Sequence, residues 1–484
     1  MAVASEGAAR TSDRAMRTKE LGEEARRQID TMIGRARAAM AAVSGYDQRR
    51  IDRLCQALGW ATANEKTFGR IVAMSVAESG LGDPESRHAK RLKIMGVLRD
   101  ALRQRSVGII EEIPEKGIVK YAKPAGVIAS LVPTTNPELT PPFTGIYALK
   151  CLDAVIFSPH PRSKRTTFEM VRVMREALRR QGAPADLFQC IENPGIAATH
   201  YLMASCDLTF ATGGQAMVRA AYSSGKPAYG VGAGNSTMII DETADIDIAA
   251  RNTRISKTSD FGSGCSADGN LLIDSRLYDA FLAALVAEGG YLATPRQAEA
   301  IERVMWDASG ARLTDTVACR PQVIAQRAGF TIPDDRRFII VEADAIGPEH
   351  NYSREKLTTL LAAFRYEGFD QALEMVKQIY EVGGKGHSCG IYSHDDEHID
   401  RLARVAPVSR IMVRQPQSKA NAGSFTNGMP MTSSLGCGIW GGNITNENIH
   451  LKHFMQTTWV SRPIPEDRPS DAELFGEFLG SETF

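Results

Sequence analysis

The chain has 484 residues, 57 Lys+Arg against 57 Asp+Glu, and a hydrophobic content of 43%. That composition is typical of a globular protein of two or three domains, and the lack of a basic excess argues against nucleic-acid binding. The eight cysteines show no CxxC spacing and form no zinc pattern with the nine histidines. We therefore expect reduced thiols, a cytoplasmic protein and no metal centre. No signal sequence and no membrane span are expected either.

The first half of the chain reads as helices followed by alternating strands and helices. Apolar residues at helical spacing predict helices over residues 20–106, and a turn at 114–117 inside an apolar stretch predicts a β-hairpin over 107–124. From residue 126, short apolar runs alternate with amphipathic segments, which predicts parallel βαβ units. The expected strands are 127–132, 154–157, 207–210 and 228–231, and the expected helices are 140–150, 166–181 and 215–222.

A second region begins near residues 241–250. The pattern of Ile273, Leu277 and residues 281–286 favours a helix. Further strands are expected at 337–343, 388–393 and 453–460, and the tail beyond the Pro-rich stretch 463–469 carries apolar residues on one helical face: Leu474, Phe475, Phe478 and Leu479. This tail can dock a partner, although packing on the chain's own oligomer is the simpler interpretation.

Two segments suggest catalytic chemistry. Cys265 lies in the run SKTSDFGSGCS, among small and polar residues that leave room for a substrate. That setting favours a nucleophilic cysteine over a buried structural thiol, which is the alternative. Asn136 follows the expected strand 127–132, at the sheet edge where ligands gather. Its amide can donate to an oxyanion, or it can simply form a turn before Pro137.

Three further segments suggest cofactor binding or tight turns. Thr212-Gly213-Gly214 follows one expected strand and opens a helix, where free backbone N–H groups can bind a phosphate. His160 follows the strand 154–157 and is either a contact to a cofactor phosphate or ribose or a solvated turn residue. Four glycines within 434–443 indicate tight packing near a bound group, or a complex turn.

Together these segments resemble the CoA-acylating branch of the aldehyde dehydrogenase superfamily. The matching pieces occur in the family's order and spacing between about residues 118 and 450: GVIASLVPTTNP, ALKCLDAVIFSPHPRSK, ATGGQAMVRAAYSSGKPAYGVGAGN, DETADI, SKTSDFGSGC, REKL and SLGCGIWGGNITNEN. Any one of them is weak, but their combination is specific.

The resemblance implies an α/β aldehyde dehydrogenase-like fold with a Rossmann-type coenzyme domain. That domain would comprise residues 1–108 and 125–242, and an α/β catalytic domain would comprise 243–445. The hairpin 107–124 and the strand 453–462 would form an oligomerisation arm that extends a neighbour's sheet, followed by a linker and tail at 463–484. A homodimer or homotetramer is expected.

The resemblance also assigns roles to residues. Cys265 matches the nucleophile, and Asn136 matches the oxyanion donor that works with the Cys265 backbone N–H. Residues of three kinds match coenzyme contacts: the pyrophosphate turn at Thr212, Gly213 and Gly214, the adenosine side at Ser158 and His160, and the nicotinamide ribose at Glu355. The coenzyme is NAD or NADP, which the sequence does not distinguish, and coenzyme A is the second substrate.

One missing carboxylate decides the expected acyl acceptor. Hydrolytic relatives carry a glutamate two residues before a paired glycine, whereas the stretch 229–235 here contains none. Water needs a general base to attack a thioester and a thiol needs less help, so we expect transfer to coenzyme A. The alternatives are a hydrolytic aldehyde dehydrogenase that releases a free acid, an acyl-phosphate reductase on the same fold, and a catalytically idle scaffold.

The segment around the cysteine departs from the family's usual SKTFDNGxxCASEQ. Ser259, Phe261 and Gly264 replace an aromatic residue, an asparagine and a larger apolar residue. These changes predict a small polar or anionic aldehyde, with sulfoacetaldehyde as the leading candidate. Candidate charge partners for such a substrate are His387, Arg414 and Lys419, although a surface position is the more ordinary interpretation of each.

Overall fold

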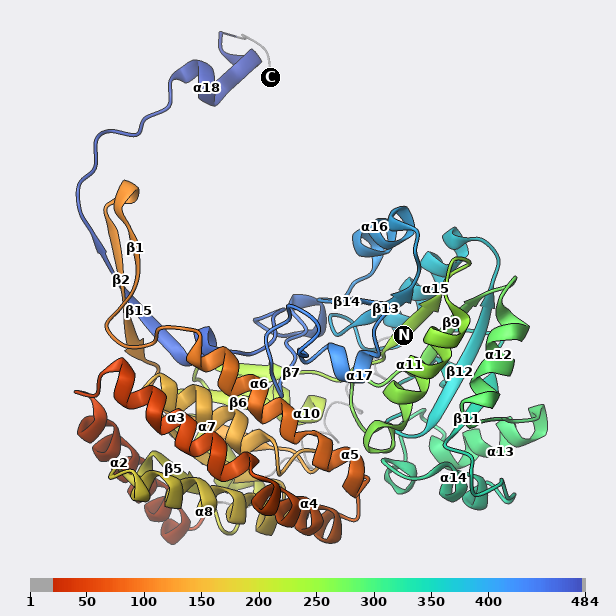
Figure 1. The fold of residues 1–484 in the computed structure, drawn as a ribbon, viewed down its shortest axis with the longest axis horizontal. Helices are drawn as coiled ribbons and strands as arrows, with labels where there is room; N and C mark the ends of the chain where they lie inside the picture. The colour runs from red at the N-terminus through yellow and green to blue at the C-terminus, as the bar shows by residue number, and fades with distance from the viewer. Residues whose placement is uncertain (1–20, 481–484) are drawn as a thin grey trace, which may run out of the picture.

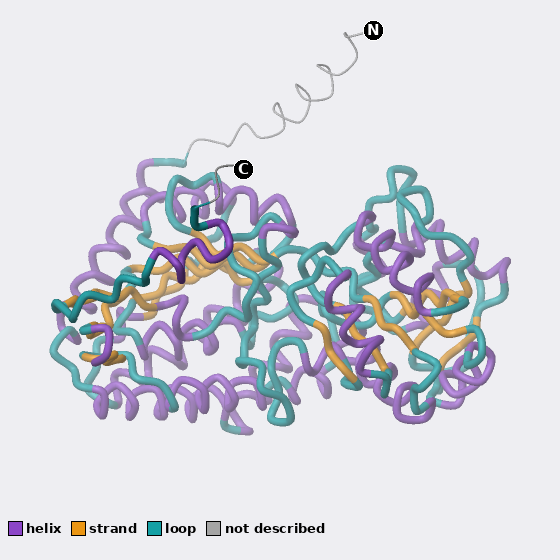
Figure 2. Tube along the Cα trace, turned by 90° about the horizontal axis from the view of Figure 1, so that it is seen from above, coloured by secondary structure: helices purple, strands orange, loops and turns teal. Residues whose placement is uncertain are grey.

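The computed structural model describes residues 21–480 and consists of two α/β lobes with a slender projection at one end (Figures 1 and 2). Each lobe has its own sheet, and the projection carries a third. Within the described residues, no helix is both long enough and apolar enough to cross a membrane.

The first lobe begins with a layer of helices, as the sequence predicted. Asp47 and Asn64 cap α3 and α4 by accepting backbone N–H groups, and α4 ends at Gly80 in the left-handed conformation. The helices are α2 (Glu23–Val43), α3 (Gln48–Ala63), α4 (Glu65–Ser79), α5 (Pro84–Ala89) and α6 (Arg91–Leu102).

The sheet of the first lobe has five parallel strands in the order β5-β4-β3-β6-β7. The chain forms β3 first, moves outward through β4 and β5, and returns to β6 on the other side of β3. The strand order therefore reverses between β3 and β6, which is where open α/β sheets bind ligands. The strands are β3 (Val127–Val132), β4 (Ala154–Pro159), β5 (Phe188–Cys190), β6 (Leu208–Thr212) and β7 (Ala228–Val231), and the helices are α7 (Thr140–Lys150), α8 (Lys164–Arg180), α9 (Ile196–Ser205) and α10 (Gln215–Tyr222).

The second lobe has seven parallel strands in the order β10-β11-β12-β9-β8-β13-β14. The strands are β8 (Thr237–Ile240), β9 (Asn270–Asp274), β10 (Gly290–Leu292), β11 (Phe338–Glu342), β12 (Leu360–Tyr366), β13 (Cys389–Tyr392) and β14 (Ile411–Val413). The helices are α11 (Ile246–Thr258), α12 (Tyr278–Ala287), α13 (Pro295–Met305), α14 (Pro321–Arg327), α15 (Phe369–Val382), α16 (Asp396–Val405) and α17 (Gln417–Ala420).

The prediction that Ile273 lies in a helix is wrong. Ile273 lies in β9, whose five residues are all buried, and the helix starts only at Tyr278. A short apolar run has the same composition in a buried parallel strand as in a buried helix, so the periodicity could not separate the two.

The projection is an antiparallel sheet in the order β1-β2-β15, from β1 (Ile109–Ile113), β2 (Ile118–Pro124) and β15 (Met455–Ser461). It stands away from both lobes, and the chain continues beyond it to α18 (Asp471–Phe475) (Figure 1). The tail residues Leu474, Phe475, Phe478 and Leu479 are each more than half exposed. The role of this sheet as an oligomerisation arm stays a prediction.

Candidate active site

Cys265 lies on a tight loop between α11 and β9, and its side chain is partly exposed. The loop begins with η4 (Ser259–Gly262), in which Asp260, Phe261 and Gly262 all have φ between +50° and +67°. Two consecutive non-glycine residues in the left-handed region are a strained backbone of the kind found at functional sites. Phe261 is costly there, and an asparagine, the family's usual residue, adopts this conformation more easily.

A histidine that the sequence did not assign to catalysis contacts the Cys265 thiol. His387 Nε2 lies 3.0 Å from Cys265 Sγ, and the histidine is fully buried. His387 precedes β13 and Cys265 precedes β9, and β8 lies between these two strands. Two parallel strands thus bring together residues that are far apart in the chain.

The hydrogen bonds around His387 determine which ring nitrogen is free. Ser236 Oγ donates to the Cys265 carbonyl oxygen at 3.2 Å, and in that arrangement Ser388 Oγ is the donor in its 3.3 Å contact with Ser236. Ser388 Oγ then accepts from Asn421 Nδ2 at 3.2 Å and from His387 Nδ1, 2.8 Å away. This arrangement assigns the His387 proton to Nδ1 and leaves a lone pair on Nε2 facing the thiol.

Burial keeps both partners of this pair neutral. It raises the pKa of the Cys265 thiol to about 12, and Glu355 adds to the shift. It lowers the pKa of His387 to about 3, with a further contribution from the positive charge of Arg410. At neutral pH the pair is thus a thiol and an imidazole, so that the imidazole can take the proton as the sulfur attacks.

Asn136 is held by a lysine that also contacts the cysteine loop. Lys90 Nζ donates to Asn136 Oδ1 at 2.7 Å and to Asp260 Oδ2 at 2.8 Å. Burial alone would raise the pKa of Asp260, but Lys90 and Arg87 outweigh it and hold that pKa below its usual range. Because the Asn136 oxygen accepts from Lys90, its NH₂ group is available to another partner, and none of residues 21–480 accepts a hydrogen bond from it.

The turn that links the two lobes packs directly against Cys265. Gly234, between β7 and β8, lies so close that an added Cβ would meet the Cys265 carbonyl oxygen at 2.0 Å. Its N–H donates to Glu355 Oε1 at 3.1 Å, and burial raises the pKa of Glu355 to about 8. Gly232 and Ala233 complete the turn, so the stretch without a carboxylate is the one that touches Cys265.

The predicted pyrophosphate turn lies at the end of β6, beside β3 at the point where the strand order reverses. Among residues 21–480, no atom of another part of the chain lies within 4 Å of a Cβ built on Gly214, and Met217 alone does so for Gly213. The first N–H groups of α10 receive no side-chain cap. This open, donor-rich helix start fits a phosphate group, and Gln215 lines a cavity of about 330 Å³ with Gly232 and Gly441.

The two residues predicted on the adenosine side lie at the end of β4. Ser158 is buried, and its Oγ lies 2.8 Å from Thr199 Oγ1, which places its hydroxyl in an internal contact. His160 is exposed, and its Nδ1 accepts a hydrogen bond from the Arg162 N–H at 3.2 Å.

The three candidate charge partners lie in three different environments. His387 is not a surface residue, because the segment before β13 carries it into the interior beside Cys265. Lys419 is partly buried, and its Nζ donates to Ser259 Oγ at 2.8 Å. Arg414 is exposed and bonds the Ser393 carbonyl oxygen. Lys419 also lines a cavity of about 440 Å³ together with Ser259 and four arginines: Arg254, Arg320, Arg336 and Arg337.

Comparison with known proteins identifies the family. The family model for the aldehyde dehydrogenase family matches residues 12–297. The chain is 42% identical over 452 residues to a sulfoacetaldehyde dehydrogenase of an Acholeplasma species, which covers 92% of this chain and 93% of the relative. It is 40% identical over 448 residues to an acylating sulfoacetaldehyde dehydrogenase of Bilophila wadsworthia, covering 92% of this chain and 97% of the relative. The chain therefore belongs to the aldehyde dehydrogenase family.

The solved structures agree on the fold. An acetylating aldehyde dehydrogenase from Geobacillus thermoglucosidasius superimposes with a TM-score of 0.89 at 34% identity, covering 92% of this chain and 99% of that one. A propionaldehyde dehydrogenase from Rhodopseudomonas palustris, solved with bound propionyl-CoA, has a TM-score of 0.80 at 24% identity, over 90% of this chain and 94% of that one. Within its family, this chain is similar to acylating members.

Proposed function

We propose that this enzyme oxidises a small anionic aldehyde through a thioester on Cys265 and transfers the acyl group to coenzyme A, with NAD or NADP as hydride acceptor. Sulfoacetaldehyde is the proposed substrate and sulfoacetyl-CoA the proposed product. The observation that carries the proposal is the contact between Cys265 and His387 beside a turn whose own residues, 232–234, carry no carboxylate. The Glu355 carboxyl group that this turn binds is largely protonated at pH 7, because burial raises its pKa to about 8.

The chemistry of the first half-reaction follows from the neutral pair. Cys265 Sγ attacks the aldehyde carbon while its proton moves to His387 Nε2, 3.0 Å away. The negative charge on the former carbonyl oxygen needs donors, and we assign that role to the Asn136 NH₂ group and the Cys265 N–H. One such donor contributes about 3 kcal/mol in comparable sites.

The residues at the coenzyme turn fit a dinucleotide. The N–H groups that begin α10 would bind its pyrophosphate, and Glu355 would bind its nicotinamide ribose. The nicotinamide, when bound, supplies the hydride acceptor. Glu355 carries much of its proton at neutral pH because burial raises its pKa to about 8.

The second half-reaction needs an acceptor for the acyl group. Residues 232–234 beside Cys265 carry no carboxylate to activate water, and the Glu355 carboxyl group bonded to the Gly234 N–H is largely protonated at pH 7. A thiol is a much stronger nucleophile than water and needs less help from a base such as His387. Coenzyme A, itself a thiol, is therefore favoured, and because one thioester replaces another the reaction is reversible. The names of the relatives and the CoA-bound neighbour support this acceptor.

The basic cavity is lined by Ser259 and Phe261 of the cysteine loop but not by Cys265, and we propose that it receives the anionic end of the substrate. Five cations line it against three carboxylates, Asp83, Glu85 and Asp334. Lys419 is the cation that contacts Ser259, six residues before the nucleophile, where the family usually has an aromatic residue. We propose that Lys419 and Ser259 bind the sulfonate.

Omission of coenzyme A tests the acyl acceptor. We expect steady NAD(P)H formation from sulfoacetaldehyde with CoA, and only a burst of about one equivalent per chain without it, because the thioester then persists. Absorbance at the NAD(P)H band measures both. Equal steady rates with and without CoA would assign hydrolysis instead, and dependence on phosphate would assign the acyl-phosphate reaction.

Replacement of Lys419 tests the substrate class. Lys419→Met should lower kcat/KM for sulfoacetaldehyde by about 10- to 100-fold, the loss of one charge-assisted hydrogen bond, and leave acetaldehyde almost unaffected. Arg414→Met is the matched control and should change neither, because Arg414 is exposed and bonded to the Ser393 carbonyl. A wild-type preference for acetaldehyde over sulfoacetaldehyde would refute the anionic substrate.

A further inference from the structure

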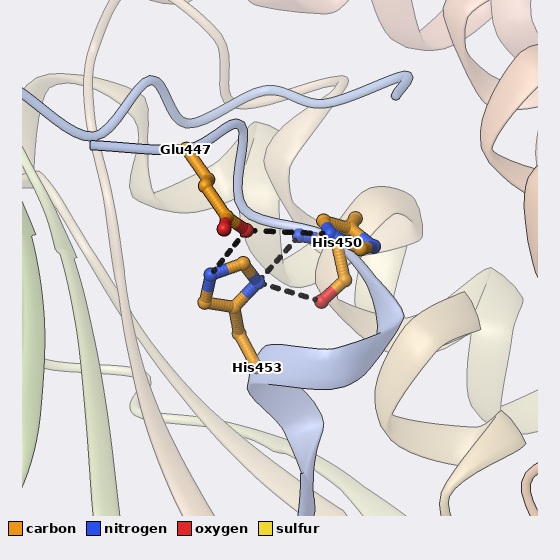
Figure 3. Close-up of side chains that lie close together, drawn as sticks. All are labelled: Glu447, His450 and His453. Atoms are coloured by element: carbon orange, nitrogen blue, oxygen red, sulfur yellow. Dashed lines mark hydrogen bonds and ion pairs between the residues drawn. The ribbon is translucent and has the colours of Figure 1, made fainter. Parts of the chain in front are cut away.

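Three side chains that the proposed chemistry does not use converge just before β15 in the chain, as Figure 3 shows for Glu447, His450 and His453. Glu447 and His450 lie on the loop before η8 (Leu451–Phe454), and His453 lies within that helix. Glu447 Oε2 is 3.7 Å from His450 Nε2 and 3.8 Å from His453 Nε2. Each residue offers one ligand atom, and the three atoms lie within 4.8 Å of one another.

The distances suit a metal ion with a small adjustment. Ligands about 2.1 Å from a tetrahedral zinc ion are about 3.4 Å apart. The observed 3.7 and 3.8 Å separations from Glu447 need to shorten by only a few tenths of an ångström. The Glu447 side chain is 44% exposed and can move, while that of His453 is 4% exposed and fixed. A carboxylate with two imidazoles is a donor set typical of zinc and other divalent transition metals.

The surroundings of His453 suit a ligand. Its Nδ1 lies 3.1 Å from the His450 backbone nitrogen, whose N–H donates to it, and 3.2 Å from the His450 carbonyl oxygen. The ring that accepts from this N–H carries its hydrogen on Nε2. Binding of a metal ion through Nε2 moves that hydrogen to Nδ1, where the His450 carbonyl oxygen can accept it. The Tyr229 ring packs edge-on against it, with the centroids 5.1 Å apart, and holds its plane.

A lysine would compete with a metal ion for the Glu447 carboxylate. Lys452 Nζ lies 2.6 Å from Glu447 Oε1 and neutralises that carboxylate. The Lys452 side chain is 53% exposed, so it can turn into solvent when an ion takes its place. An exposed ion pair contributes little to stability, whereas a metal ion bound by three protein ligands contributes much more.

We propose that Glu447, His450 and His453 form a binding site for one zinc-class divalent metal ion. The ion would brace a loop that contacts the cofactor turn, since the Gly436 N–H donates to the Glu447 carbonyl at 3.0 Å. Two residues before Gly436, Ser434 Oγ lies 2.9 Å from Thr212 Oγ1. The site is thus structural and connects the base of β15 to the pyrophosphate turn.

Calorimetric titration of the tag-free chain with Zn²⁺ tests the site. The titration uses a Cys265→Ala background, because the thiol and imidazole of the nucleophile can bind zinc themselves. We expect one ion per chain and at least 10-fold weaker binding in Glu447→Gln and in His450→Ala. His350→Ala is the matched control and should bind as the parent does, because His350 lies 3.6 Å from Glu349 as an exposed pair away from this site.

A second variant acts in the opposite direction. Lys452→Met removes the competing cation and should tighten zinc binding severalfold, which a misfolded protein would not do. Absence of binding in the Cys265→Ala chain would overturn the proposal. Full affinity in Glu447→Gln and His450→Ala would overturn it as well, and an unchanged affinity in Lys452→Met would contradict the competition.

Discussion

The two large sheets contribute to the same site from opposite edges. In the five-stranded sheet, the candidate residues follow the carboxyl ends of strands: Asn136 after β3, Gly213 after β6 and Gly232 after β7. In the seven-stranded sheet, they precede the amino ends of four adjacent strands: Gly234 before β8, Cys265 before β9, Glu355 before β12 and His387 before β13. The chain passes from one edge to the other through the Gly232–Gly234 turn.

The two edges have different tasks. Carboxyl ends of parallel strands lead into helix N-termini, whose free N–H groups suit a phosphate and an oxyanion. The amino edge of the other sheet provides the thiol, the imidazole and the buried carboxyl group, which need burial to set their protonation. Neither edge alone forms the complete site. Variants at the carboxyl edge should therefore affect coenzyme binding and oxyanion stabilisation, and variants at the amino edge should affect attack by the thiol.

Loss of the nucleophile should have the largest effect. Cys265→Ala removes the sulfur that we propose carries the acyl group, and turnover should fall by about 10⁴-fold or more. The side chain is partly exposed, so its truncation should leave the fold intact. Steady-state assays and circular dichroism measure the two quantities. A folded Cys265→Ala protein that keeps a tenth of the activity would remove Cys265 from this role.

Loss of the imidazole should come next. His387→Gln cannot take the thiol proton, and we expect turnover to fall by about 10²- to 10⁴-fold. Because burial raises the pKa of Cys265 to about 12 and lowers that of His387 to about 3, the free enzyme holds a thiol. Alkylation of Cys265 by iodoacetamide should therefore accelerate steadily from pH 6 to 9. A rate independent of pH over that range would indicate a preformed thiolate instead.

Ser388→Ala is a milder change to the same hydrogen-bonded group. It keeps His387 but removes the oxygen that accepts from Nδ1, 2.8 Å away. The ring can then adopt the other tautomer, so the loss of activity should be smaller than in His387→Gln. A loss of activity equal to that of His387→Gln would mean that the hydrogen bond between His387 and Ser388 is required as well as the imidazole.

The sequence predicted the carboxyl edge better than the amino edge. Strands β3 and β7 and helices α7 and α10 were predicted with the residues observed, because glycine turns and apolar runs mark them locally. The general rule for ligands at strand ends pointed to Asn136 and Thr212. No comparable rule points to the residues before a strand.

His387 shows why the residues at the amino edge were harder to predict from the sequence. Its neighbours Gly386 and Ser388 give no local sign of catalysis, and the contact with Cys265 spans 122 residues. Only the strand order β9-β8-β13 brings the two together, and strand order is not written in local periodicity. Lys90 was missed for the same reason, because its contacts with Asn136 and Asp260 depend on how the lobes meet.

The buried carboxyl group at the amino edge should make stability depend on pH. Glu355 has a pKa of about 8 when folded and an ordinary value of 4.5, so the unfolded chain ionises first. The contribution of protonated Glu355 to the free energy of unfolding is fully present below about pH 4.5 and is lost as the pH rises towards 8. At about 1.4 kcal/mol per pKa unit, Glu355→Gln should gain roughly 2 to 4 kcal/mol relative to wild type between pH 5 and 8. Urea unfolding at both pH values measures the difference, and a constant difference would contradict the buried proton.

Lys90 connects the two edges, and its loss should lower turnover less than the loss of Cys265 or His387. Its ammonium group bonds Asn136 after β3 and Asp260 in the cysteine loop, so it positions the proposed oxyanion donor relative to the loop of the proposed nucleophile. Lys90→Met should lower kcat about tenfold with little change in KM, since positioning acts on the transition state. In an Asn136→Ala background the same substitution should cost almost nothing further, because no amide is left to orient. If the losses of kcat in the double variant are additive, Lys90 does not act through Asn136 and only supports the fold. Arg87 also pairs with Asp260, so that carboxylate keeps one cationic partner when Lys90 is replaced.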